Sequence, residues 1–365
     1  MSANGLVGAF WPTDRQKLLL RAALLQGESG ESAWRKLGPG FRVDELDSAS
    51  TGVLPLLYRQ LERRGIEDPL LPRLRGVYRR TWYVNQLRLD RLGGALGALH
   101  EAEADPLVVG SWELPVRYYD ELGLRPAATL HVLVRPDRVR LAKEALRDHG
   151  DGDQCYVHRR LFADFEDAAS GLEPEDLWEA AIELELGGVA TRTLGPADEL
   201  LNVCLSGART NAWPSILWVA DAVTVLAVAS SELDWERLVR QARRIRATLR
   251  LRDALVFLRD ELEAAVPADV VAALEATPTS RREQIAHQVA GAGRGRLGGP
   301  PEVFTRFLRV TADRSVAQAI AEAPRFLRDE WGLERGAQIP LTALRKAGGR
   351  LVRATRPGAE RTGPR

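Results

Sequence analysis

The stretch RPAATLHVLVRP, residues 125–136, decides how the middle of this chain folds. Its centre, TLHVLV, is mainly apolar and predicts a short buried strand. Successive side chains of a strand leave opposite faces, so Thr129 and His131 should point from the same face. Two polar side chains on one face of a buried strand mark the place where a candidate site should be sought.

The segments on either side predict further strands and a helix. Residues 106–111 (PLVVGS) are apolar and β-branched, and residues 154–162 (QCYVHRRLF) alternate in polarity. Residues 137–150 (DRVRLAKEALRDHG) predict a helix that begins at an aspartate and stops at a glycine. Strands are therefore expected at 106–111, 129–134 and 154–162, in a small mixed sheet embedded in a mainly helical α+β chain.

The rest of the chain shows helical periodicity, with apolar stripes beside arginine-rich faces. This pattern predicts four regions: an N-terminal helical region at 1–104, the α/β core at 105–165, a C-terminal helical region at 166–340, and a basic, flexible tail at 341–365.

Composition narrows the classes of function. The 365 residues are 45% hydrophobic and carry a net charge of +1, so no overall field favours nucleic acid or a membrane. Two cysteines, Cys155 and Cys204, predict buried thiols and not a disulfide framework or a metal site. No signal peptide and no apolar run of membrane-spanning length is seen, which predicts a cytoplasmic protein.

Several segments, in order, carry a resemblance to a known family. They include GVLPLLYRQL (52–61), YYDELGLRP (118–126), ADELLNVCLSGAR (197–209) and WVADAVTVL (218–226). Together they resemble the bacterial "uncharacterised nucleotidyltransferase" family, a branch of the DNA polymerase β-like superfamily. The resemblance implies a small nucleotidyltransferase sheet set among helices.

The resemblance also implies where catalytic residues should stand, and there this chain departs from the family. A Lys-Gly pair should follow the first strand, but Val109 precedes Gly110 here. An Asp-x-Asp pair should lie on the second strand, but the chain has Thr129 and His131.

Two later positions differ in the same way, and two agree. Tyr156 replaces an acidic residue, although His158 matches the family histidine, and Ser206 replaces a later histidine. Asp221 matches a helical aspartate of the family, and as a charge in an apolar helix it is expected to pair with an arginine.

The candidate cleft is therefore Gly110, Ser111, Thr129, His131, Tyr156, His158 and Asp221, with no catalytic residue and no metal ligand assigned. Magnesium needs hard oxygen ligands, chiefly carboxylates, and the expected positions offer none. A hydrogen-bonded polar remnant of an old cleft is the favoured interpretation. A transition-metal or general-base site at the same residues is the alternative.

Three functions stay open at this point. The first is a pseudoenzyme that serves as a binding or accessory module beside peptide natural-product or cell-surface polysaccharide pathways, as the resemblance implies. Its partner would be a biosynthetic protein or peptide, with weak nucleotide binding left open and no cofactor expected. The second is an active nucleotidyl or phosphoryl transferase that uses Mg²⁺ and relocated acids such as Glu113, Asp120, Asp151 or Asp153. The third is an unrelated helical adaptor.

Overall fold

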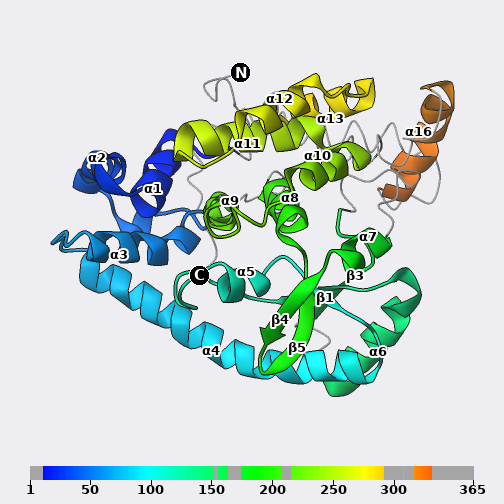
Figure 1. The fold of residues 1–365 in the computed structure, drawn as a ribbon, viewed down its shortest axis with the longest axis horizontal. Helices are drawn as coiled ribbons and strands as arrows, with labels where there is room; N and C mark the ends of the chain where they lie inside the picture. The colour runs from blue at the N-terminus through cyan, green and yellow to red at the C-terminus, as the bar shows by residue number, and fades with distance from the viewer. Residues whose placement is uncertain are drawn as a thin grey trace.

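A five-stranded mixed sheet lies in the middle of the chain, with helices from both ends of the sequence around it (Figure 1). The strand order is β3-β2-β1-β5-β4. The pairs β2–β3 and β1–β5 are parallel, whereas β1–β2 and β4–β5 are antiparallel. The strands are β1 (Leu107–Val108), β2 (Leu130–Leu133), β3 (Cys155–His158), β4 (Ile182–Leu186) and β5 (Val189–Thr193). The fold is α+β and mainly helical, as predicted.

The computed structural model describes residues 11–150, 155–162, 174–207, 215–291, 307 and 316–330. Its helices are α1 (Asp14–Leu24), α2 (Gly27–Leu37), α3 (Leu54–Arg63), α4 (Leu71–Glu101), α5 (Glu113–Arg117), α6 (Val139–His149), α7 (Pro174–Glu179), α8 (Pro196–Gly207), α9 (Leu217–Val228), α10 (Trp235–Arg244), α11 (Thr248–Leu262), α12 (Ala268–Ala276), α13 (Arg281–Gly291) and α16 (Val316–Glu330). Short 3₁₀ turns occur at Gly38–Gly40, Val43–Glu45, Thr51–Val53 and Pro136–Arg138. The predicted basic tail, 341–365, lies outside the described residues.

The three predicted strands form, and each is shorter than its predicted range. Strand β1 has only two residues, because Gly110 adopts φ +83° and turns the chain out of the sheet. The ladder still continues past the strand ends: Val109 N donates to His131 O at 2.9 Å, and Val134 N donates to His158 O at 2.9 Å. The backbone of the predicted site is therefore held by sheet pairing.

Within the region 166–340, which was expected to be helical, residues 182–193 instead form the hairpin of β4 and β5. Its leucines are buried and its glutamates exposed in strict alternation, and Gly187 and Gly188 turn it with φ +60° and +75°. This is the usual chemistry of a two-residue hairpin turn. Because β5 pairs with β1, the sheet extends beyond the predicted core at 105–165.

The two faces of the sheet pack against different parts of the chain. Leu130 and Val132 join a core cluster with α4 and α6, whereas Leu133 joins a larger cluster with helices from both ends of the sequence. His131 alternates with Leu130 and Val132, so its side chain lies on the face of Leu133. The site residues therefore face the side on which the C-terminal helices pack.

Helix α4 crosses the β4–β5 turn at a glycine. A Cβ atom added to Gly93 would lie 2.3 Å from the carbonyl oxygen of Gly187, which is far inside van der Waals contact. Gly97, one turn along the same helix, has open space around its Cα. The close approach of α4 to the hairpin thus depends on Gly93.

We expect Gly93→Ala to destabilise the fold by about 1–3 kcal/mol, since overpacking forces the backbone to shift. Gly97→Ala is the matched control and should stabilise by up to about 1 kcal/mol, because alanine is the better helix former. Urea unfolding of both variants measures this. Equal behaviour of the two would contradict the close packing of α4 on the hairpin.

Cys155 and Cys204 are buried thiols without a disulfide, as predicted. Among the described residues, every helix is too short or too polar to cross a membrane.

Candidate functional site

Four of the predicted site residues lie side by side on one face of β2 and β3. Thr129 Oγ1 and His131 Nε2 share a hydrogen bond of 2.9 Å, and His131 Nδ1 lies 2.9 Å from His158 Nε2. The His131 ring also stacks on Tyr156, with centroids 5.1 Å apart. Parallel pairing causes this, because it sets His131 opposite Tyr156. Tyr156 is 54% exposed, so solvent reaches this polar cluster.

The donors of this cluster do not suit magnesium. They are a hydroxyl, two imidazoles and a phenol, whereas Mg²⁺ is held by carboxylates, phosphates and waters. Within the described part of the chain, no three His, Cys, Asp or Glu side chains are grouped to hold a metal ion. Asp151 and Asp153, two of the proposed relocated acids, lie outside the described residues. The hydroxyl–imidazole–imidazole chain can instead pass a proton along its hydrogen bonds.

The backbone N–H groups of Gly110 and Ser111, in the turn after β1, form a small anion-binding turn, here called the cradle. A side chain of the protein itself occupies it. The N–H groups of Gly110 and Ser111 both donate to the carboxyl group of Glu113, the latter at 3.1 Å. Successive N–H groups in such a turn are a common site for a phosphate or another anion. Glu113 is completely buried. The internal carboxyl therefore takes the position that a bound anion would need.

A buried ion pair fastens this cradle to the C-terminal helices. Arg125 Nη1 donates to Ser111 O at 2.6 Å, and its Nε and Nη2 each lie 3.0 Å from the carboxylate oxygens of Asp221 on α9. Tyr119 also donates its hydroxyl to Asp221 at 2.8 Å. Arg125 supplies the arginine partner expected for Asp221. Asp221 is thus committed to Arg125 and Tyr119 and ties the turn of Gly110 and Ser111 to α9.

A second buried carboxyl, which the sequence analysis did not single out, lies near the cradle. Glu199 on α8 is 1% exposed; Asn202 donates to one of its oxygens at 3.4 Å, while the other has no partner. Burial raises the pKa of Glu199 well above its usual value, and the nearby Glu113 raises it further. Burial also raises the pKa of Glu113, although two N–H bonds and Arg125 oppose the rise. Burial and the neighbouring Glu113 thus both favour the protonated form of Glu199.

Three other positions are not part of this arrangement. Val109, in place of the family lysine, is buried in the core, and Ser206 is bonded to Asn202 within α8. Asp120 forms an exposed ion pair with Arg63 at 3.1 Å, away from the buried cradle. The cradle and the polar cluster meet through the backbone bond from Val109 to His131.

The family model described as "Uncharacterised nucleotidyltransferase" matches residues 48–262, more than half of the chain. The chain belongs to this family. No curated protein and no solved structure matches it. The match spans α3 to α11 and includes the whole sheet. All the candidate positions of this nucleotidyltransferase-family chain, from Gly110 to Asp221, lie within the matched residues.

Proposed function

We propose that this nucleotidyltransferase-family chain has lost nucleotidyl transfer and acts as a binding or accessory module. Its partner would be a protein or peptide of a biosynthetic pathway for a peptide natural product or a cell-surface polysaccharide, a context that the family resemblance suggests. The observation that carries the proposal is the donor set of β2 and β3, where Thr129, His131 and Tyr156 offer no carboxylate.

Two physical arguments support the loss of catalysis. Nucleotidyl transfer uses Mg²⁺ to gather the triphosphate charge and to activate the attacking oxygen, and a neutral donor set does not offset the dehydration of the metal. In addition, Glu113 fills the N–H pair of Gly110 and Ser111, so an incoming phosphate must displace a buried carboxyl. The neutral donor set weakens the binding of the metal, and the Glu113 carboxyl weakens the binding of the phosphate.

The competing function is an active Mg²⁺-dependent transferase with relocated acids. Glu113 is committed to the cradle and Asp120 to an exposed ion pair, so neither supports this alternative. Asp151 and Asp153, the other two acids named for this alternative, lie beyond the described residues.

The test is a set of titrations with ATP, GTP and CTP, with and without Mg²⁺. For the natural chain, Mg²⁺ is expected to change nucleotide affinity by no more than about twofold, because the donor set of β2 and β3 has no carboxylate to hold the metal. A site that did hold it would gain at least one charge-assisted contact, which is worth about tenfold in affinity. The double variant Thr129→Asp/His131→Asp restores two carboxylates on one strand face and should gain about tenfold in Mg²⁺-dependent affinity. The control Thr129→Asn/His131→Asn has matched size without charge and should gain nothing.

One outcome would overturn the proposal. If the natural chain transfers a labelled nucleotide in the presence of Mg²⁺, and Asp151→Ala or Asp153→Ala abolishes that transfer, the chain is an active enzyme with relocated acids.

A further inference from the structure

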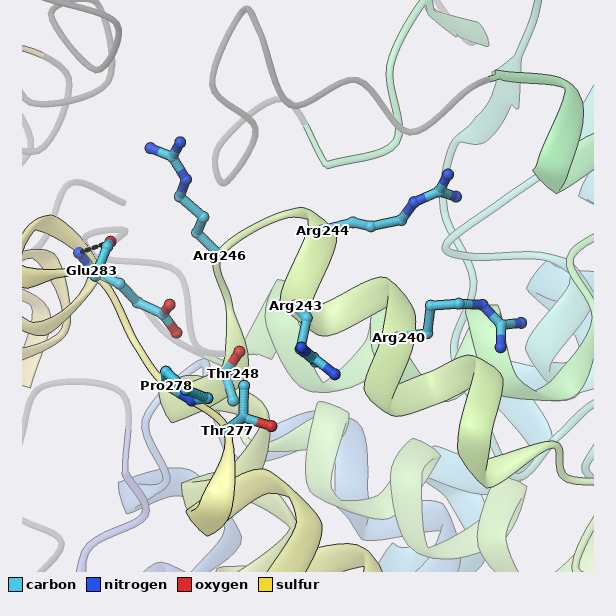
Figure 2. A pocket seen from close by; sticks show the side chains of 9 residues that line it. Arg240, Arg243, Arg244, Arg246, Thr248, Thr277, Pro278 and Glu283 are labelled. Atoms are coloured by element: carbon cyan, nitrogen blue, oxygen red, sulfur yellow. Dashed lines mark hydrogen bonds between the residues drawn. The ribbon is translucent and has the colours of Figure 1, made fainter.

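A hollow of about 460 Å³ opens among the C-terminal helices, and it is built separately from the sheet and the polar cluster (Figure 2). Its wall consists of the last turns of α10, the turn into α11, and the loop between α12 and α13. Four arginines line it: Arg240, Arg243, Arg244 and Arg246. Small-molecule sites commonly have this size, but most are far more apolar.

The lining of this arginine hollow, as far as the structure describes it, has four arginines and one acidic side chain. Arg244 forms an ion pair with Asp176. Arg240 has an electrostatic interaction with Asp198, but the ion-pair partner of Asp198 is Arg237, at 2.8 Å. Among the described residues, Arg243 has no ion-pair partner.

The one acidic residue of the lining is used internally. Glu283 accepts the N–H of Leu249 at 3.0 Å, in the first turn of α11, and burial raises the pKa of its carboxyl group. Glu283 also interacts electrostatically with Arg246, so a single carboxyl group stands among the four arginines of the lining.

Hydroxyl groups complete the lining. Ser280 Oγ accepts the N–H of Glu283 at 3.1 Å, which leaves its own O–H available to donate. Thr248 and Thr277 also line the hollow. Thr248 is 1% exposed, and Thr277 donates its own hydroxyl to Ala273 O at 2.8 Å, so Ser280 is the hydroxyl donor of this lining. Guanidinium and hydroxyl donors around a polar concavity are the groups that bind phosphate oxygens.

We propose that the arginine hollow binds a small molecule bearing a chain of phosphate groups. A polyphosphate fits because several arginines line one hollow, so that more than one guanidinium group is available for successive phosphates. A nucleic acid fits less well, since the chain has a net charge of only +1 and the arginines surround a hollow instead of forming a long stripe. This site does not depend on the loss of catalysis proposed above.

A glycine substitution at Arg246 can separate ligand binding from folding. Its backbone has φ +53°, a left-handed conformation that suits glycine better than a residue with a Cβ atom. Arg246→Gly therefore removes a guanidinium and relieves backbone strain at the same time. Loss of ligand binding without loss of thermal stability would separate a binding role from a folding role.

The experiment is calorimetric titration of the full chain with inorganic triphosphate, in EDTA so that no metal site contributes. The natural chain is expected to bind it, and Arg243→Glu should weaken binding by about tenfold or more through loss of a charge-assisted contact. Arg246→Gly should also weaken binding while the melting temperature stays unchanged or rises. The control Arg80→Glu makes the same charge reversal on an exposed position of α4 and should bind as the natural chain does.

Three results would overturn the proposal: no triphosphate binding by the natural chain, equal weakening by Arg80→Glu, or tight binding of a short oligodeoxythymidine in place of triphosphate. The last would assign the hollow to nucleic acid. Because Thr129→Asp/His131→Asp should not alter this binding, failure here is distinguishable from failure of the proposed function.

Discussion

Arg125→Met is expected to lower the free energy of unfolding by about 3–5 kcal/mol, because it leaves the Asp221 carboxylate buried without its cation. Both partners of this ion pair are almost fully buried, with side-chain exposures of 7% and 5%, and two hydrogen bonds of 3.0 Å join them. The substitution also removes the bond to Ser111 O. Urea unfolding followed by tryptophan fluorescence measures the loss.

Two comparisons separate the buried charge from general damage. The double variant Arg125→Met/Asp221→Leu removes both charges and should recover a large part of the loss, because Asp221 is then no longer a buried carboxylate without its cation. Arg140→Met breaks the exposed pair of Arg140 with Glu144 and should cost no more than about 0.5 kcal/mol. If the single Arg125 variant costs as little as Arg140→Met, the pair does not hold the turn of Gly110 and Ser111 against α9.

Glu199→Gln is expected to flatten the dependence of stability on pH. Burial and Glu113 raise the pKa of Glu199 in the folded chain, whereas the unfolded chain has a value near 4.5. The folded state therefore holds this proton more strongly, and its contribution is fully present below about pH 4.5. That contribution is lost as pH rises through the folded pKa, at about 1.4 kcal/mol for each unit of the shift.

The glutamine side chain has the same shape as Glu199 and keeps an oxygen that accepts from Asn202, but it does not titrate. Above neutral pH the variant should thus be more stable than the natural chain, and the two should converge in acid. Glu185→Gln is the matched control, since Glu185 lies exposed on β4 and should leave the profile unchanged. Parallel profiles for the natural chain and Glu199→Gln between about pH 5 and 9 would show that Glu199 keeps an ordinary pKa.

Local pattern predicted much of the fold but not all of it. The hairpin at 182–193 carried a readable signal, since IELEL alternates and Gly-Gly is a preferred two-residue turn. It was missed because the flanking helical periodicity dominated. Trp82 shows the limit of helical spacing: it lies on the long amphipathic helix α4, yet its side chain is 45% exposed. Periodicity identifies an apolar stripe, but a stripe is buried only where another element packs on it.

The amino-acid sequence by itself determined the family, the strands around TLHVLV, and the neutral donors at Thr129, His131 and Tyr156, because these depend only on residue type and spacing. It also implied that Asp221 needs a partner, because an isolated charge in an apolar helix is costly. Only the tertiary structure decided that this partner is Arg125, that Glu113 fills the turn of Gly110 and Ser111, and that four arginines of α10 and the following turn surround one hollow. These depend on which segments become neighbours when α8 to α13 pack, and pairing between distant segments is set by the whole fold and not by local spacing.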